Sequence, residues 1–377
     1  MQGNEEQLAS HSQRAIIIIG PVSPFRGGIA QHTTMLARAL ADSHVCRILS
    51  FKRLYPKLIF PGQSDRDPDH EGQAEPRTEY LLDTLNPFTW RRVAKRAQQM
   101  RPDFVLIPWW TFFLGPLSLY IAWALRRRDI DVVFFCHNVL DHEETAWKRA
   151  LARLVLRQGS RFVVHTRVEE SRLKELIPGA VVAVHPHPIY DQFPEPKRHL
   201  PRRAGLELLF YGFVRPYKGL DVLTKAIGLL KGQDVFLTVA GEFWQGEKEI
   251  RQQIAQLAIE DQVEIISRYV SDQETAQLFD RSDLVILPYR SATGSGVIPI
   301  AYHYGKPVIA TRVGGLPDVV WDGKTGRIVP PGDVKALANA IREMTQPRAA
   351  DMRRKIEQIK RQLTWHNLAK AAMDLDH

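Results

Sequence analysis

The chain has 377 residues, and its 44% hydrophobic and 25% charged content is that of a globular protein, which excludes a fibrous or broadly disordered one. Its length favours two domains of about 150 to 190 residues each. Lys and Arg outnumber Asp and Glu by 51 to 42, an excess that favours polyanionic partners: nucleic acid, acidic membrane or phosphorylated small molecules.

The two cysteines, Cys46 and Cys136, each lie in an apolar, strand-like run, so they indicate neither a disulfide framework nor a zinc site. Residues 1–13 lack the apolar core of a signal peptide, and we expect a flexible tail there. Together these features predict a cytoplasmic protein.

Short apolar runs alternate with amphipathic segments of helical length in the first half of the chain. The runs are "AIIIIG" (15–20), "FVLIP" (104–108), "DVVFFC" (131–136), "RFVVH" (161–165) and "AVVAVH" (180–185). This alternation predicts a parallel, doubly wound sheet. Residues 52–100 are less regular, and we expect loops there with one helix near 89–100.

Residues 109–125 carry no charge, which raises the alternative of a membrane span. Gly115 and Pro116 interrupt the stretch. We therefore expect the end of a strand followed by a buried helix.

The strand pattern starts again in the second half. Its runs are "LELLFYG" (206–212), "VFLTVAG" (235–241), "VEIISR" (263–268), "LVILP" (284–288) and "PVIAT" (307–311). The proline-rich, basic stretch 188–205 is the expected linker, with the boundary near Leu200. We assign 14–195 to an N-terminal Rossmann-like domain, 196–355 to a C-terminal one, and 356–377 to a last helix that crosses back to the first domain, anchored by Trp365.

Helix-start signals are clear in the second half. Ser271 and Glu274 fit a capping box, and Asp333 fits the N-cap of the helix that follows. Two parallel sheets in tandem turn the carboxyl ends of their strands toward a shared cleft, where ligands of such sheets bind.

Gly27 and Gly28 follow the first strand and precede a helix. Glycines at this point let backbone N–H groups approach an anion, although a turn that only requires positive φ is the alternative. The spacing is not the GxGxxG fingerprint of dinucleotide-binding folds.

His137 follows the strand 131–136 and would project into the cleft, where it could bond a hydroxyl substrate or accept its proton. A structural histidine is the alternative. His142 and Glu143 are expected to start a helix.

In the second half, Arg215 and Lys218 lie between a strand and a helix, where fixed cations can neutralise a phosphate and stabilise a departing diphosphate. Two solvated loop charges are the alternative.

The stretch "LPYRSATGSGVIPIAYHYGKPVIAT" (287–311) contains no carboxylate between Ser291 and Tyr304. Its loop offers the amides of Ser295, Gly296 and Val297 to an anion, and the hydroxyls of Ser291, Thr293 and Ser295 can assist. A diphosphate could therefore be held without an acidic side chain. A tight loop without a ligand is the alternative.

Seven motifs in this order resemble glycosyltransferase family 4, whose members have the two-Rossmann GT-B architecture. The motifs are "PFRGGIAQHT", "CHNVLDHEE", "YGFVRPYKGLDVL", "VAGE", "PYRSATGSGV", "GKPVIATRVGGLPDVV" and "GRIVPPGDVKALANAI". The resemblance spans residues 16 to about 343.

The resemblance implies a retaining transfer of a sugar from a nucleotide-diphosphate donor to a hydroxyl acceptor, with no metal and no other cofactor. Lys218 matches the diphosphate-binding lysine of the family, Gly27 and Gly28 the glycine pair near the sugar, and His137 the acceptor-side histidine. The expected catalytic residues are His137, Arg215 and Lys218. The expected donor-binding residues are Gly27, Gly28, Gly212, Arg215, Lys218, Thr293, Gly294, Ser295, Gly296 and Val297.

Two departures from the family pattern stand out. The positions of its paired glutamates hold Ala292 and Ile300, and the position of its phosphate-site arginine holds Phe213, with Arg215 two residues later as a candidate replacement. We expect a variant donor contact. The alternatives are a pseudoenzyme that binds a nucleotide sugar or a partner glycosyltransferase, and, less in keeping with the absent fingerprint, a nucleotide-dependent oxidoreductase.

Family members often act on lipid-linked acceptors in envelope polysaccharide or glycolipid synthesis. Residues 86–101 and 123–128 mix aromatic and basic side chains, so they could contact anionic lipid headgroups, with solvated helix faces as the alternative. No nucleic-acid recognition motif accompanies the positive charge, and we expect no nucleic-acid partner.

Overall fold

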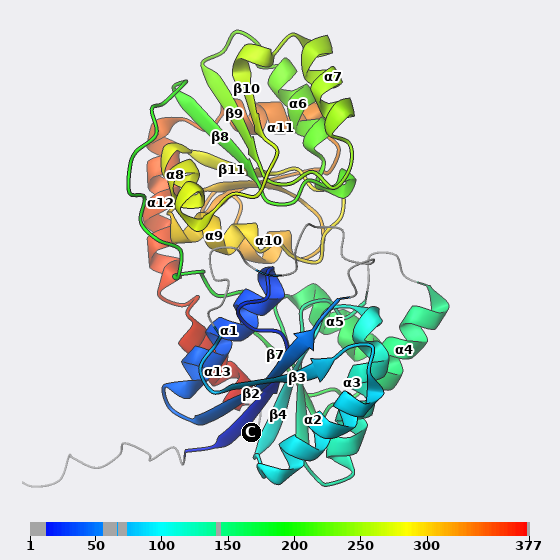
Figure 1. Cartoon of the computed structure of the whole chain (residues 1–377). Helices are drawn as coiled ribbons and strands as arrows, with labels where there is room; N and C mark the ends of the chain where they lie inside the picture. The colour runs from blue at the N-terminus through cyan, green and yellow to red at the C-terminus, as the bar shows by residue number, and fades with distance from the viewer. Residues whose placement is uncertain (1–12, 56–65, 67–73, 141–144, 375–377) are drawn as a thin grey trace, which may run out of the picture.

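The computed structural model describes residues 13–55, 66, 74–140 and 145–374. The chain forms two lobes, the N-terminal lobe below and the C-terminal lobe above in Figure 1, and each is built on a parallel sheet. The sequence-based expectation of two doubly wound sheets is confirmed. Residues 1–12 of the expected tail, together with His142 and Glu143, lie outside the described residues.

The N-terminal lobe has a seven-stranded sheet in the order β3-β2-β1-β4-β5-β6-β7. Its strands are β1 (Ala15–Ile19), β2 (Val45–Arg53), β3 (Thr78–Asp83), β4 (Phe104–Trp109), β5 (Asp131–Cys136), β6 (Arg161–Val164) and β7 (Val182–Val184). The strand order reverses direction between β1 and β4, so the loops after these strands diverge and open a crevice at their carboxyl ends.

Both faces of this sheet are buried, which explains why its central strands are apolar along their whole length. In β1, Ile16 and Ile18 pack against one helical layer while Ile17 and Ile19 pack against the other. The first layer consists of α1 (Gly28–Ala41) and α13 (Trp365–Met373). The second consists of α2 (Pro87–Gln99), α3 (Gly115–Arg126), α4 (Ala146–Leu156) and α5 (Arg167–Leu176), with the 3-10 turn η2 (Phe112–Leu114) before α3.

The prediction for residues 52–100 is wrong in one respect, because it places loops where β3 forms. This strand lies at the edge of the sheet and is mostly half-buried, so its sequence "TEYLLD" carries a weaker apolar signal than a central strand. The predicted helix is confirmed as α2, which begins two residues earlier, at Pro87, after an Asn86 cap.

The prediction for residues 109–125, which rested on Gly115 and Pro116, is confirmed. The stretch divides into the end of β4 and the buried helix α3, which begins at Gly115. None of the helices in the described part of the chain combines the length and apolar character that crossing a bilayer requires.

The C-terminal lobe has a six-stranded sheet in the order β10-β9-β8-β11-β12-β13. Its strands are β8 (Leu206–Tyr211), β9 (Val235–Ala240), β10 (Val263–Ile266), β11 (Leu284–Leu287), β12 (Val308–Thr311) and β13 (Gly326–Val329). Its helices are α6 (Leu220–Gly228), α7 (Glu247–Leu257), α8 (Asp272–Arg281), α9 (Val297–His303), α10 (Leu316–Val319), α11 (Val334–Arg342) and α12 (Gln346–Lys360), with the 3-10 turns η3 (Pro216–Lys218) and η4 (Glu260–Gln262). The capping box of α8 and the Asp333 cap of α11 are confirmed.

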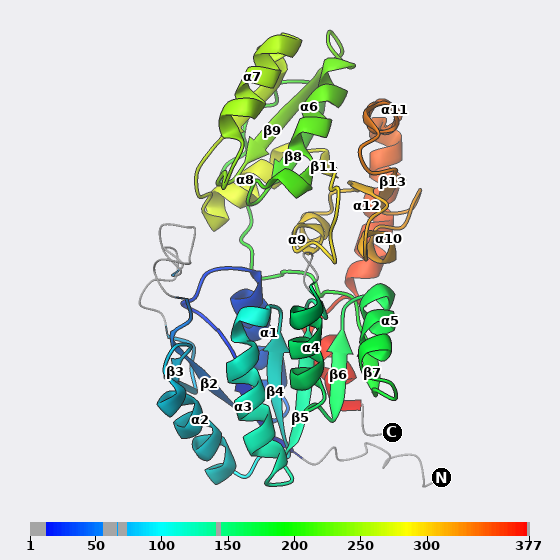
Figure 2. The same cartoon turned by 90° about the vertical axis from the view of Figure 1, so that its right-hand side faces the viewer.

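The end of the chain returns to the N-terminal lobe. Helix α12 packs against α9, the chain turns at residues 361–364, and α13 packs against α1 (Figures 1 and 2). Trp365 is 5% exposed, and its ring lies 5.0 Å from that of His32 and 5.8 Å from that of Tyr190. The limits proposed for the domains stay predictions; in the structure, residues 185–205 join β7 to β8.

Direct polar contacts link the lobes across the cleft. Arg26 pairs with Glu242 at 2.6 Å, and the backbone N–H of Arg167 donates to Asp318 at 3.0 Å. The Thr293 hydroxyl donates to the Asn138 side chain. These contacts fix the walls of the cleft relative to each other.

Candidate active site

The cleft contains a cavity of about 350 Å³ that we call the lysine cavity. Its walls come from the start of α1 in one lobe and, in the other, from loops that follow β8, β9, β10 and β11. The residues that line it are Arg26, Gly27, Gly28, Gln31, Tyr190, Phe193, Tyr211, Gly212, Phe213, Tyr217, Lys218, Gly241, Tyr269, Val270, Asp272, Tyr289, Gly294, Ser295, Gly296, Val297 and Ile300. Eight of the ten expected donor-binding residues are among them.

Lys218 supplies the cavity with a buried cation. Its side chain is 9% exposed and, within the described ranges, makes no hydrogen bond or ion pair. Burial, and secondarily the charge of Arg215, lower the pKa of Lys218 to about 8, so the ammonium is still protonated at neutral pH.

Gly212 makes room for this ammonium. A Cβ at Gly212 would lie 3.5 Å from the Lys218 Nζ, and the glycine φ is +92°. A side chain here would therefore strain the backbone, and its Cβ would be in contact with the cation.

Arg26 is a second cation of the lysine cavity, and sequence reasoning missed it. It reaches from the N-terminal lobe to Glu242 of the other lobe, and its guanidinium lies 4.6 Å from the Tyr269 ring centre and 5.3 Å from that of Phe213. Phe213 occupies the family's arginine position, so a guanidinium from the opposite lobe lies beside the position where the family pattern has its own. The available signal was the place of Arg26 directly before Gly27.

Arg215, the replacement expected from the sequence, does not line the lysine cavity. Its guanidinium stacks on the Trp244 ring at 3.4 Å from the ring centre. Burial lowers the pKa of Arg215, and its charge acts on Lys218 at a distance. The structure thus brings Lys218, and not Arg215, to the surface of the cavity.

The loop before α9 forms another wall. The backbone N–H groups of Ser295 and Gly296 donate no hydrogen bond to any residue that the structure describes, whereas that of Val297 faces the Ser295 hydroxyl at 3.3 Å. That hydroxyl also lies 3.3 Å from the Tyr289 hydroxyl. Ser291 and Thr293 do not line the lysine cavity, so their expected help there is not seen.

A second cavity, of about 200 Å³, adjoins the first, and we call it the histidine cavity. His137, His165 and His187 line it, and each directly follows or lies close behind one of the strands β5, β6 and β7. Thr293 lines this cavity too. Gly28, Tyr190 and residues 294–296 line both cavities, so a ligand could extend from one to the other.

The histidines of this cavity are neutral at physiological pH. Burial, reinforced by neighbouring imidazoles, lowers the pKa of His137 to about 3. It also lowers the pKa of His187 to about 4 and that of His165 well below its usual value. His137 can therefore exchange hydrogen bonds with a hydroxyl group, but it is too weakly basic to keep a proton at neutral pH.

Two family models together match almost the whole chain. Residues 27–188 match the glycosyl transferase 4-like domain, and residues 191–363 match the glycosyl transferases group 1. The chain belongs to the group 1 glycosyltransferases. The break between the two matches falls at 189–190, within the linker that joins the two lobes of this glycosyltransferase.

Curated relatives cover part of the chain. A D-inositol 3-phosphate glycosyltransferase of Saccharomonospora viridis is 28% identical over 69% of this chain and 67% of its own length. One from Mycobacterium sp. is 30% identical over 63% of this chain and 59% of its own length. The matches thus span about three fifths to two thirds of these relatives.

Solved structures match over nearly the full length. Sucrose-phosphate synthase from Thermosynechococcus elongatus has a TM-score of 0.73 at 19% identity and covers 96% of this chain and 98% of its own. Anabaena Alr3699/HepE in complex with UDP-glucose has a TM-score of 0.73 at 18% identity, with the same coverage. At this identity the likeness establishes the shared two-lobed GT-B fold.

The carboxylates of this glycosyltransferase differ from the family pattern as the sequence indicated. Ile300 lines the lysine cavity, and Ala292 is buried outside it. The structure adds an acid that the sequence did not reveal, because Asp272 at the start of α8 also lines the cavity.

Proposed function

We propose that this glycosyltransferase moves a sugar from a nucleoside-diphosphate donor to a hydroxyl of a saccharide or lipid-linked saccharide, with retention at the anomeric carbon. One observation carries the proposal: the buried cation Lys218 lines a cavity together with Ser295 and Gly296, whose backbone N–H groups donate to no residue that the structure describes. A buried cation is costly unless an anion compensates it. A diphosphate has the charge and the oxygen atoms that these groups require.

The proposed chemistry uses both cavities. The bond between the anomeric carbon and the diphosphate oxygen breaks, and the acceptor oxygen forms its bond on the same face of the sugar. The acceptor proton passes to the departing phosphate oxygen. Lys218 and the backbone N–H groups stabilise the negative charge that develops there, so we propose that this step needs no metal ion.

The acceptor hydroxyl would approach through the histidine cavity, whose histidines are uncharged. Neutral imidazoles suit a hydroxyl-rich substrate. His137 would form a hydrogen bond with the acceptor hydroxyl, while the departing phosphate takes the proton of that hydroxyl. The names of the curated relatives, which act on an inositol phosphate, support an acceptor of this kind. We place the reaction in envelope polysaccharide or glycolipid synthesis.

A donor panel tests the proposal. Purified protein is incubated with nucleotide sugars and a saccharide or lipid extract, and release of nucleoside diphosphate is measured. NMR of the product then gives the anomeric configuration, and inversion would contradict the proposal. Addition of Mg²⁺ or Mn²⁺ should leave the rate unchanged.

Donor binding without turnover is the second candidate function, that of a pseudoenzyme. The observation that favours it is Ile300, an apolar side chain at a place in the lysine cavity where the family pattern has a carboxylate. In that case calorimetry would detect a nucleotide sugar, and no extract would give product.

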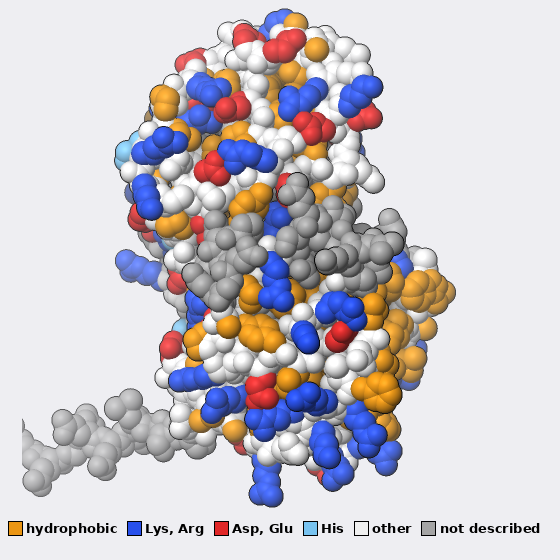
Figure 3. Space-filling view, viewed as in Figure 1, with side chains coloured by type: hydrophobic (Ala, Val, Ile, Leu, Met, Phe, Trp, Pro, Cys, Tyr) orange, Lys and Arg blue, Asp and Glu red, His pale blue; other side chains and the backbone are white. Residues whose placement is uncertain are grey.

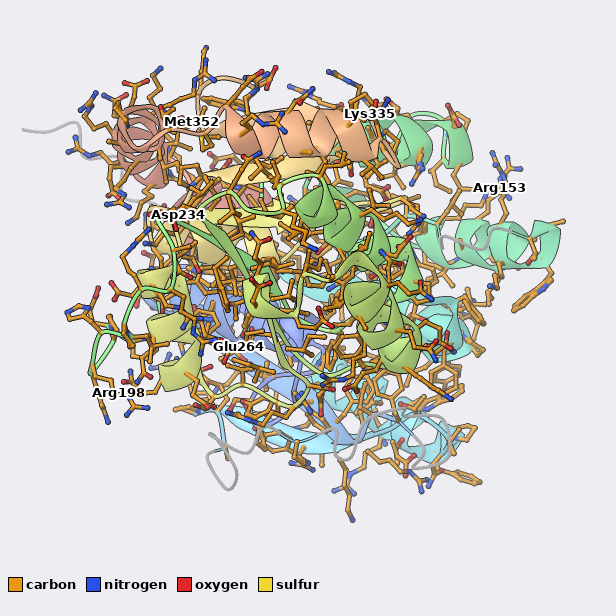
Figure 4. The ribbon with its side chains drawn as sticks, turned by 90° about the horizontal axis from the view of Figure 1, so that it is seen from above. Arg153, Arg198, Asp234, Glu264, Lys335 and Met352 are labelled. Atoms are coloured by element: carbon orange, nitrogen blue, oxygen red, sulfur yellow. The ribbon has the colours of Figure 1, made fainter. Side chains whose placement is uncertain are left out.

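We also propose a cytoplasmic location with peripheral contact to anionic membrane. Phe88 on α2, Trp123 on α3 and Trp147 on α4 are 85%, 43% and 57% exposed, and these helices cover the same face of the N-terminal sheet. Apolar and basic side chains intermingle on the lower right of Figure 3, and Arg153 of α4 projects from the edge of the molecule in Figure 4. Such a mixture suits the interface of an anionic bilayer.

Vesicle flotation tests this contact. Replacing Phe88 and Trp147 together by Ser should reduce binding to anionic vesicles several-fold, whereas Leu229→Ser, which removes an exposed apolar side chain of the C-terminal lobe, should not. Equal binding by all three proteins would refute it.

A further inference from the structure

Four histidine rings pack together beneath the cleft. His32 of α1 is 1% exposed, and its ring centre lies 4.5 Å from that of His137, 5.1 Å from that of His165 and 5.0 Å from that of His187. Apolar rings would fill this volume without polar atoms. Imidazole nitrogens, by contrast, require partners when they are buried.

The nitrogens of this cluster divide into satisfied and unsatisfied ones. His187 has both bonded, Nδ1 at 2.8 Å from the Pro188 carbonyl and Nε2 at 3.1 Å from the Tyr190 hydroxyl. The Nε2 atoms of His32, His137 and His165 are buried, and none has a hydrogen-bond partner among the described residues. Three neighbouring imidazoles thus each have a buried Nε2 atom without a hydrogen-bond partner among the described residues.

The three unsatisfied histidines converge. One ring nitrogen from each lies within 4.8 Å of the other two, so a point exists within about 2.8 Å of all three. Zinc–imidazole bonds are about 2.0 to 2.1 Å long, and each nitrogen would need to move by roughly 0.7 Å to reach an ion at that point. Small side-chain rotations supply such shifts.

The chemistry of the rings also fits a metal ion. The Nδ1 of His165 lies 3.0 Å from the His185 carbonyl, so this nitrogen donates its hydrogen and Nε2 keeps a free lone pair.

We propose that His32, His137 and His165 form a binding site for one divalent transition-metal ion of the zinc class. Three imidazoles leave a further coordination position, and His137 and His165 line the histidine cavity toward which it would open. The nearby Glu169 is not a ligand, because its carboxylate accepts from the Val139 N–H at 2.5 Å and pairs with Arg172 at 2.8 Å. The site goes beyond the proposed function but shares His137 with its acceptor side, so the tests below measure metal binding and not sugar transfer.

Metal content tests the site directly. The full chain, purified without a polyhistidine tag, is supplied with Zn²⁺, desalted and analysed by mass spectrometry for metal per chain. About one zinc ion per chain is expected for the unaltered protein, and less than one tenth of that for His32→Gln or His165→Gln.

Two other histidines provide matched controls. His187→Gln changes the same cluster at a ring whose nitrogens are both bonded, and His303→Gln changes a partly buried histidine of α9 whose Nε2 lies 3.1 Å from the Phe193 carbonyl. Both should retain the zinc ion. Loss of zinc in either control would overturn the three-ligand assignment.

A measurement on the unaltered chain covers the case in which the ligand variants do not fold. The apo-protein with one equivalent of Co²⁺ should develop the visible absorption of a low-symmetry cobalt–imidazole site, and one equivalent of Zn²⁺ should abolish it. Absence of both the absorption and the bound zinc would overturn the proposal. Because neither readout requires sugar transfer, its failure is distinct from a failure of the proposed function.

Discussion

The lysine cavity and the histidine cavity share a wall, yet burial gives them opposite character. It lowers the pKa of Lys218 to about 8 and that of His137 to about 3. Because the ordinary values of these groups differ by about four units, the same physical effect leaves the lysine charged and the histidine neutral at physiological pH. The lysine cavity therefore suits an anion, and the histidine cavity suits an uncharged hydroxyl.

Removing the charge of Lys218 should reduce sugar transfer more than any other change considered below. Lys218→Met keeps the bulk of the side chain but removes the cation, and we expect sugar transfer to fall at least about 100-fold, since one transition-state contact is typically worth that much. The measurement is kcat/KM for the nucleotide-sugar donor.

A second buried lysine provides the control. Burial also lowers the pKa of Lys306 to about 8, but its Nζ donates to the Asp280 carbonyl at 3.0 Å and it lines neither cavity. Lys306→Met should leave kcat/KM within a few-fold of the starting value. Similar losses of kcat/KM in both variants would mean that the effect comes from lowered stability and not from a lost contact with the diphosphate.

Removing Arg26 should have the second-largest effect, because Glu242 already compensates part of its charge. We expect Arg26→Ala to weaken binding of a nucleoside diphosphate roughly 10- to 30-fold, as measured by calorimetry. Arg38→Ala is the control, since Arg38 pairs with Glu75 within the N-terminal lobe and does not line the lysine cavity. If Arg26→Ala lowered only the melting temperature, this guanidinium would have no role in the site.

The sequence predicted the fold better than it predicted the site. Buried central strands such as β1 and β5 carry long apolar runs, and the Ser271 and Asp333 caps are local signals, so both could be recognised. The edge strand β3 could not, because its half-exposed side chains blur the pattern. Lys218 was found because its motif is local too.

Contacts between segments that lie far apart in the chain could not be predicted from the sequence. Arg26 lies 216 positions from Glu242, and nothing near either residue indicates that they meet. His32 lies in α1, His137 directly follows β5 and His165 directly follows β6, and only the fold brings these three residues together. Arg215 was favoured because it lies near Lys218 in sequence, but its side chain turns to Trp244.

The pKa of Lys218 predicts how donor binding depends on pH. A bound diphosphate raises this pKa, so affinity is full below pH 8 and falls as the free enzyme loses its proton. Between pH 7 and pH 9 we expect the affinity for a nucleoside diphosphate to fall about tenfold, and a flat profile for Lys218→Met. Over the range from about 8 to 10.5 the stability of the ligand-free protein should instead rise, because the unfolded chain binds more protons there.

The smallest effect should come from the Ser295 hydroxyl, and it tests whether main-chain groups hold the diphosphate. The hydroxyl makes only long contacts of 3.3 Å with the Tyr289 hydroxyl and the Val297 N–H, whereas the N–H groups of Ser295 and Gly296 remain in place when Ser295 becomes Ala. We therefore expect Ser295→Ala to change nucleoside-diphosphate affinity by no more than about threefold, the size of one weak neutral hydrogen bond. A loss of affinity above about 30-fold would mean that the Ser295 hydroxyl, and not the main chain, binds the anion beside Lys218.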